Sequence, residues 1–177
     1  MKTINLQILN CSICLKSARG KLVVGEGNPK ADIVVVGEAP GRKEIETGQP
    51  FIGPAGKILD GLLAKAKLDR KDIFITSAVK YLPIGYVTPK LKDIKHGREH
   101  LFSQLRSIKP KVVILLGHTA AQSVLGNKVS LPKFHGKVVE ERDGIKYMIF
   151  YHPAAALYSR KLLPTMEEDF RKLKKYL

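Results

Sequence analysis

The sequence predicts an α/β fold, with three α/β/α layers around a central, mostly parallel four-stranded sheet. Short apolar runs rich in β-branched residues recur along the chain, helical stretches separate them, and a hairpin follows near the end. The runs are residues 32–36, 73–76 and 112–116. They do not alternate polar with apolar residues, which is typical of strands buried on both faces of a parallel sheet.

Helical periodicity fills the segments between these runs. Residues 55–68 repeat apolar side chains at helical spacing, and residues 91–108 do the same along one face. Strands that alternate with helices of this length indicate a mostly parallel sheet. Residues 137–142 and 145–150 flank Asp143 and Gly144, which suit a tight hairpin turn. A last amphipathic helix is expected over residues 166–177.

Length and composition indicate one globular domain over residues 1–177, with 44% hydrophobic and 27% charged residues. The apolar runs are far shorter than the roughly 18 residues that a membrane span requires. Asn5, Gln7 and Asn10 interrupt the first ten residues, so no signal peptide is expected. Two cysteines cannot build a disulfide framework, and the spacing of Cys11 and Cys14 indicates metal or redox chemistry in a reducing cytoplasm.

The net charge is +15, and the isoelectric point is about 9.9. Such an excess fits a protein that binds a polyanion, of which nucleic acid is the commonest in the cytoplasm. A lysine-rich surface that only maintains solubility explains the charge equally well. Basic residues concentrate in residues 90–111 and again in residues 160–175.

Reactive groups of open parallel sheets lie in the loops beyond the carboxyl ends of the strands. The first such loop, residues 37–56, contains Glu44 and Phe51 among glycines and prolines. Glu44 is a candidate to act on a water molecule and Phe51 to stack on a flat ligand. An ordinary connection, with a solvated glutamate and a core phenylalanine, is the simpler interpretation. In the last loop, His152 before Pro153 either donates into a cleft or is structural.

Taken together, the motifs are more specific than each is alone. They comprise residues 37–41 (GEAPG), 50–53 (PFIG), 55–56, 75–76 leading to 79–80, 116–117 and 152–154 (HPA). In this order and spacing they resemble the uracil-DNA glycosylase superfamily, most closely the family 4 enzymes of archaea and thermophilic bacteria. The opening segment, with Cys11, Cys14 and residues 25–29, agrees with the same family.

The resemblance implies hydrolysis of the N-glycosidic bond between uracil and deoxyribose in DNA, as in base excision repair. The base must first leave the duplex stack. By correspondence with the family motifs, Glu44 orients the attacking water and His152 stabilises the departing uracil. Phe51 stacks on the flipped base, and backbone groups around Glu38 and Ala39 line the pocket.

A DNA-contacting loop is implied after the histidine. Leu157 corresponds to a residue that fills the space vacated by the base, with Ser159, Arg160 and Lys161 near the phosphates. Core packing of Leu157 is an equal alternative. We expect a monomer that acts on uracil-containing DNA, single or double stranded, without a membrane partner, in the nucleoid-associated cytoplasm.

Ser77 departs from the family pattern, which has asparagine at this position to read the base edge. A hydroxyl cannot match the paired contacts of an amide, and a lost contact of this kind costs ~1–3 kcal/mol of discrimination. Relaxed or altered specificity, for example toward hypoxanthine, is the resulting hypothesis.

The cysteines form the second departure. The resemblance implies a [4Fe–4S] cluster on four cysteines, but this chain has only Cys11 and Cys14, with Tyr81 at the third position and His96 near the fourth. Zinc on Cys11, Cys14 and His96, with or without His100, is one alternative. Loss of any metal is the other.

Two other function classes remain for comparison. Ser77 and the incomplete cysteine set favour a catalytically weak DNA-binding homologue, whereas Glu44, Phe51 and His152 argue for an enzyme. A nucleotide-binding α/β protein is disfavoured, because the first loop lacks the Gly-Lys-Ser/Thr phosphate cradle.

Overall fold

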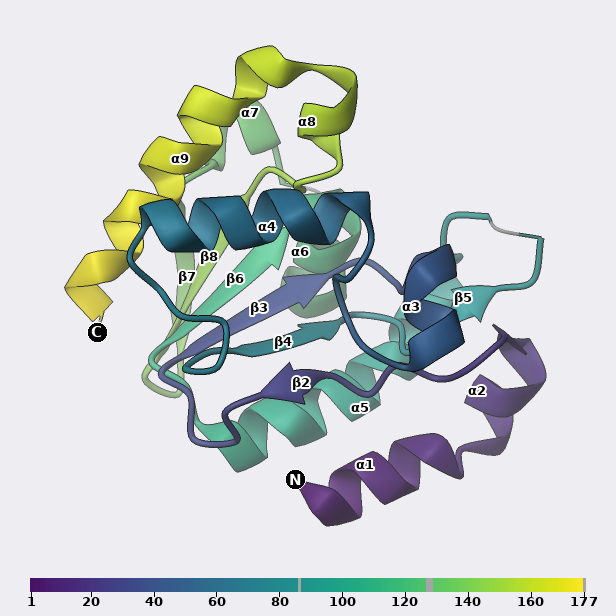
Figure 1. The fold of residues 1–177 in the computed structure, drawn as a ribbon. Coiled ribbons are helices and arrows are strands. Elements are labelled where there is room, and N and C mark those ends of the chain that lie inside the picture. Colours follow the sequence, from purple (N-terminus) through teal and green to yellow (C-terminus); the bar gives the residue numbers. More distant parts are fainter. Residues whose placement is uncertain (86, 127–128, 177) are drawn as a thin grey trace.

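A six-stranded sheet runs through the centre of the molecule, in the order β2-β4-β3-β6-β8-β7 (Figure 1). The computed structural model describes residues 1–85, 87–126 and 129–176. The strands are β2 (Glu26–Gly27), β3 (Ile33–Gly37), β4 (Phe74–Ser77), β6 (Val112–Leu116), β7 (Lys137–Arg142) and β8 (Ile145–Phe150). The predicted mostly parallel sheet is confirmed, but the predicted number of four strands is wrong. Strands β4-β3-β6-β8 are parallel, and one short or hairpin strand adds to each edge in antiparallel pairing.

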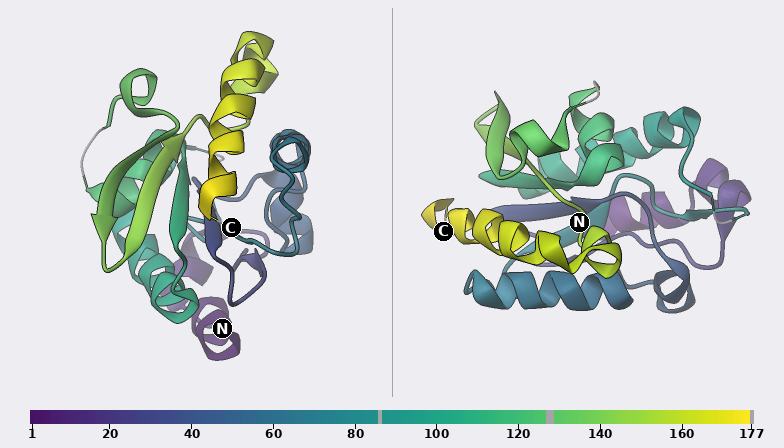
Figure 2. Two further views of the ribbon diagram at one scale, coloured as in Figure 1. Left: turned by 90° about the vertical axis from the view of Figure 1, so that its left-hand side faces the viewer. Right: turned by 90° about the horizontal axis from the view of Figure 1, so that it is seen from above.

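Helices cover both faces of this sheet, so the three-layer prediction is also confirmed (Figure 2). On one face, α4 (Pro54–Lys65) and α9 (Leu163–Arg171) pack against alternate strand residues such as Val35 and Ile114. On the other, α5 (Leu91–Ile108) and α6 (Gly117–Leu125) pack against the intervening residues, such as Val36 and Leu115. The central strands are buried on both faces, which is why their sequences are continuously apolar.

The remaining elements are short and lie mostly at the two ends of the chain. They are α1 (Lys2–Leu9), α2 (Ser12–Ser17), β1 (Ala18–Arg19), α3 (Arg42–Thr47), β5 (Leu82–Pro83), α7 (Leu131–Phe134), α8 (Ala155–Tyr158), η1 (Arg160–Leu162) and η2 (Lys172–Tyr176). Strands β1 and β5 pair as a separate two-stranded sheet. In Figure 1, α1 lies alongside α5, away from the parallel strands.

The predicted final helix over residues 166–177 is placed differently. The α-helix starts three residues earlier, at Leu163, with Pro164 in its first turn, and the chain continues from Lys172 as a 3₁₀-helix. Pro164 fits there because a proline in the first turn removes no intrahelical hydrogen bond. Residue 177 lies outside the described residues. Among the helices of the described part, none combines the length and apolarity that a membrane crossing needs.

Candidate active site and metal centre

A pocket of about 430 Å³ opens beyond the carboxyl ends of the parallel strands. It gathers segments that are far apart in sequence: the loop after β3, the end of β4, and the loop after β8. Six of the predicted site residues line it, namely Ala39, Glu44, Phe51, Ser77, His152 and Leu157. A larger hollow of about 600 Å³ between β2 and residues 69–71 contains none of them, so the smaller pocket is the candidate active site.

Glu44 lies in the first turn of α3 and is only 8% exposed, so the interpretation as a solvated glutamate is wrong. Its Oε1 accepts hydrogen bonds from the backbone amides of Ile52 (3.0 Å) and Gly53 (2.8 Å). A Cβ on Gly41 would lie 2.6 Å from Oε2. The two amides therefore fix one carboxylate oxygen, and the missing side chain of Gly41 leaves room for the other.

Phe51 presents its ring to the pocket while its backbone is held in the left-handed region at φ 52°. That conformation is uncommon for a bulky residue and requires support from its surroundings. The Arg70 guanidinium supplies part of it, donating to the carbonyl oxygens of Phe51 (3.1 Å) and Pro50 while it pairs with Asp60. On the opposite side, a Cβ on Gly37 would lie 2.7 Å from the Phe51 ring.

His152 follows β8 and faces Phe51, with their ring centroids 5.7 Å apart. Its Nδ1 accepts a hydrogen bond from the backbone amide of Ala154 at 3.1 Å. This bond assigns the ring hydrogen of the neutral imidazole to Nε2. Burial lowers the pKa of His152 to about 4, so the ring is neutral at physiological pH. The residue therefore offers one N–H donor, on Nε2.

Ser77 ends β4 and is buried in the pocket wall. Its hydroxyl donates to the carbonyl oxygen of Val79 at 2.7 Å. The single hydroxyl hydrogen is thus used within the protein, and only oxygen lone pairs remain for a ligand. Toward a base edge, Ser77 acts as an acceptor.

Lys80, to which the sequence analysis assigned no role, holds the end of β4 through hydrogen bonds. Its Nζ is buried and donates to Thr76 Oγ1, Ser77 O and Gln104 Oε1 at 2.6–2.7 Å. Burial lowers the pKa of Lys80 to about 7. These bonds hold the Ser77 carbonyl in place. Gln104 belongs to α5, and it lies beside Lys80 only because of the way the chain folds.

Glu38 corrects one prediction, because it is not among the described residues that line the pocket. Its carboxylate accepts a hydrogen bond from Thr119, and its backbone carbonyl oxygen accepts one from the amide of Val79 at 3.0 Å. Both groups thus bond to other parts of the protein, and of Glu38 and Ala39 only Ala39 lines the pocket.

The predicted DNA-contacting loop lies at the pocket rim. Leu157 is 51% exposed on α8, so the core-packing alternative is wrong. Tyr158, which the sequence analysis missed, is 92% exposed beside it. Ser159, Arg160 and Lys161 follow directly without lining the pocket, and the last two are exposed. The basic residues that do line it, Arg42 and Lys43, come from α3, while no lining residue of the described chain comes from residues 90–111.

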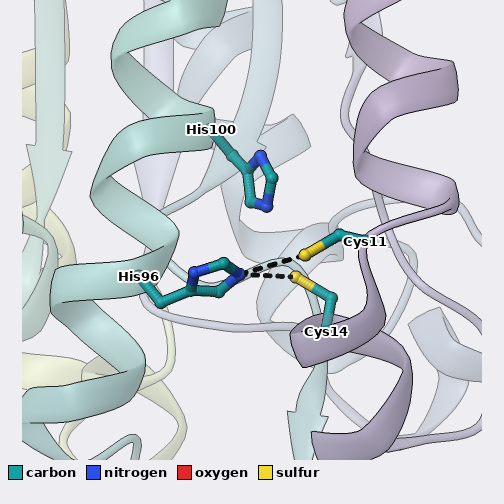
Figure 3. Close-up of side chains that lie close together, drawn as sticks. All are labelled: Cys11, Cys14, His96 and His100. Carbon is teal, nitrogen blue, oxygen red and sulfur yellow. Dashed lines mark hydrogen bonds between the residues drawn. The ribbon is translucent and has the colours of Figure 1, made fainter.

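A second constellation lies between the N-terminal segment and α5. Cys11 and Cys14 flank the start of α2, and His96 and His100 are one helical turn apart on α5 (Figure 3). One donor atom from each residue lies within 4.8 Å of all the others, so the four could hold a metal ion. His96 Nε2 is 3.2 Å from Cys11 Sγ and 3.4 Å from Cys14 Sγ.

Comparison of the sequence with known proteins identifies the family. The model of the uracil DNA glycosylase superfamily matches residues 24–177. The chain belongs to this superfamily. It is 39% identical to a type-4 uracil-DNA glycosylase of Archaeoglobus fulgidus, over 94% of this chain and 88% of the relative. It is 40% identical to a type-4 uracil-DNA glycosylase of Saccharolobus solfataricus, over 97% of this chain and 83% of the relative. It is 35% identical to that of Thermotoga maritima, over 100% of this chain and 94% of the relative.

The [4Fe–4S] cluster that the resemblance implies does not fit the donors of this superfamily member. Such a cluster needs a ligand for each of four irons, normally four cysteine thiolates, and the chain has two. Tyr81, at the expected third position, donates its hydroxyl to Asp93 Oδ1 at 2.7 Å. The donor atoms of Cys11, Cys14, His96 and His100 instead lie close enough together to hold a single metal ion.

Proposed function

We propose that this chain is a uracil-DNA glycosylase, which hydrolyses the bond between uracil N1 and deoxyribose C1′ and leaves an abasic site for base excision repair. The observation that carries the proposal is the meeting of a fixed carboxylate, a neutral imidazole and an aromatic ring in one pocket. A protein that only bound DNA would need neither the buried Glu44 nor the oriented His152.

Uracil enters the pocket after leaving the duplex stack and lies against the Phe51 ring, which the Arg70 and Gly37 contacts hold in position. As the glycosidic bond breaks, negative charge develops on uracil. His152 Nε2–H donates a hydrogen bond to a uracil carbonyl oxygen and stabilises this charge. Because burial keeps the ring neutral, the histidine acts as a hydrogen-bond donor and keeps its proton.

Glu44 acts on the sugar side of the bond. Its carboxylate stabilises the positive charge that develops on the deoxyribose and orients the water that attacks C1′. The hydroxyl group of that water becomes bonded to C1′, and its proton balances the charge of the departing uracil anion. The Ile52 and Gly53 amides keep Oε1 in place, so Oε2 is the oxygen available to the water.

DNA binding follows from the charge around the rim. Lys43 lines the pocket, and the exposed Arg160 and Lys161 follow α8, where they approach phosphates on either side of the flipped nucleotide. Leu157 fills the space that the base leaves. Since all of these groups come from one chain, we propose that the protein acts as a monomer, on DNA in the nucleoid-associated cytoplasm.

The bonding of Ser77 favours a second candidate activity. With its hydrogen donated to Val79, the hydroxyl accepts from a ring N–H but cannot donate to the adjacent carbonyl oxygen. Uracil and hypoxanthine both present a ring N–H beside a carbonyl group, so the contact with Ser77 does not discriminate between them. Excision of hypoxanthine is therefore the proposed secondary activity.

One set of oligonucleotides tests both activities. Matched single- and double-stranded substrates carry uracil, hypoxanthine, xanthine or thymine at one position, and strand breakage after alkali reports abasic sites. We expect rapid release of uracil, measurable release of hypoxanthine and none of thymine. Absence of uracil release from both strand forms would contradict the proposed function, and strict uracil preference would remove the secondary activity alone.

A further inference from the structure

We propose that Cys11, Cys14, His96 and His100 form a tetrahedral zinc site in place of an iron–sulfur cluster. Two thiols and two imidazoles are the donor set of many structural zinc sites. The cysteines are three residues apart at the start of α2, and the histidines are four apart on α5, a spacing that puts both rings on the same helix face. The proposal concerns a site outside the pocket and does not depend on the glycosylase activity.

The spacing of the donors fits one small ion. With Zn–S bonds near 2.3 Å and Zn–N bonds near 2.0–2.1 Å, tetrahedral donors stand about 3.3–3.8 Å apart. His96 Nε2 lies 3.2 and 3.4 Å from the two sulfur atoms, and all four donors are within 4.8 Å of one another. Shifts of about 1 Å or less therefore bring the donors to tetrahedral separations. Four iron atoms would require the ligands to separate and two further thiolates, which the chain lacks.

His100 provides an independent sign that a ligand is missing from the group. Its Nε2 is buried without a hydrogen-bond partner, which is a costly state for a polar atom. The ring packs edge-on against His96 at 5.0 Å between centroids, and Figure 3 shows both rings beside the two sulfur atoms. Coordination of a zinc ion satisfies this nitrogen, whereas the protein groups around it do not.

The position of the site indicates a structural role. It connects the N-terminal segment to α5, and it adds to the α1–α5 contact, the two-residue pairing of β1 with β5 and the buried cluster that contains Cys14 and Ile94. Gly97, directly after His96 in α5, lets the helix approach residues 78–79 so closely that a Cβ would lie 2.2 Å from Ala78 O. Zinc would thus fix the N-terminal segment onto the helix that packs behind the Ser77 end of β4.

The first experiment counts metals in the full chain. Protein purified without oxygen from cells supplied with both iron and zinc is analysed for metals and acid-labile sulfide. We expect one zinc per chain, little iron and no sulfide. Replacement of zinc by Co²⁺ should give the intense visible absorption bands of tetrahedral cobalt, with a thiolate charge-transfer band in the near ultraviolet. Four irons with sulfide, or no stoichiometric metal, would overturn the proposal.

Variants then assign the ligands. Cys14→Ser and His96→Ala should lose most of the zinc and melt several degrees lower, and His100→Ala should change the cobalt spectrum. The matched control is His118→Ala, since this histidine is exposed on α6 and should keep both zinc and melting temperature. If a variant fails to fold, the cobalt spectrum of the unaltered chain still decides. Equal zinc loss from the control, or a Cys11–Cys14 disulfide in the anaerobic protein, would contradict the site.

Discussion

The backbone amide of Ala154 donates a hydrogen bond to Nδ1 of His152, and this bond decides which nitrogen of the ring faces the substrate. Nε2 then carries the hydrogen, and in the proposed reaction the neutral ring donates a hydrogen bond from Nε2 to the leaving uracil. A histidine that acted as a general acid would need to be protonated near neutral pH. Burial prevents this by lowering the pKa of His152 to about 4.

The pH dependence of His152 follows from this shift. Between the ordinary value of 6.5 and about 4, the unfolded chain binds a proton that the folded chain does not. This histidine therefore lowers the free energy of unfolding as the pH falls from 6.5 to about 4, by about 3 kcal/mol over the whole window. Above pH 6.5 it does not change the free energy of unfolding. Excision should show no inflection near pH 6.5. An NMR titration of His152 with a midpoint near 6.5 would contradict the account.

Gly37→Ala should weaken the binding of the flipped base, because the added methyl group displaces the Phe51 ring. Stacking on an aromatic ring is worth ~1–3 kcal/mol per base, so we expect about a tenfold or greater loss in substrate affinity. Gly61→Ala is the matched control. Nothing lies within 4 Å of its Cβ position in α4, and the substitution should stabilise the helix by about 0.5–1 kcal/mol. Equal losses in both variants would indicate a general effect of glycine replacement.

Ser77→Asn should strengthen recognition of the base edge, because an amide both accepts from a ring N–H and donates to the adjacent carbonyl oxygen. Uracil and hypoxanthine share this edge, so excision of both should become about tenfold faster, within the ~1–3 kcal/mol of a base-edge contact. Single-turnover rates on the two substrates measure this change directly. Unchanged rates on both would show that Ser77 does not read the base.

Leu157→Ala should slow excision from double-stranded DNA and leave single-stranded DNA almost unaffected, because only a duplex has a vacated space to fill. Leu6→Ala, which truncates an exposed leucine on α1, is the control. Parallel rate measurements on the two strand forms give the comparison. Equal slowing on both forms would assign Leu157 to general DNA contact instead.

The sequence predicted the parts of the fold that depend on strong local patterns. Residues 91–108 and the 137–150 hairpin were placed with their observed bounds, since amphipathic periodicity and an Asp-Gly turn are local signals. Strands β1, β2 and β5 are two residues each, too short for any period, and they exist because the neighbouring backbone pairs with them.

Six residues of the pocket wall were predicted from the sequence, whereas their hydrogen bonds were not. Motifs identified Glu44, Phe51 and His152, but nothing in the sequence connects Arg70 with the Phe51 carbonyl or Lys80 with Gln104. Such contacts depend on how distant segments pack. The sequence left open whether His100 joins Cys11, Cys14 and His96, and the structure places it among them because the fold brings α5 beside the two cysteines.

Single-turnover release of uracil by Glu44→Gln tests the central claim most directly. The substitution keeps the shape and an oxygen for the Ile52 and Gly53 amides but removes the charge. We predict an excision rate about 10²–10⁴-fold lower, with binding to uracil-containing DNA retained. The control is Glu46→Gln, which changes an exposed glutamate on the same helix and should leave the rate unchanged. A Glu44→Gln enzyme that excises uracil at the rate of the unaltered chain would contradict the account.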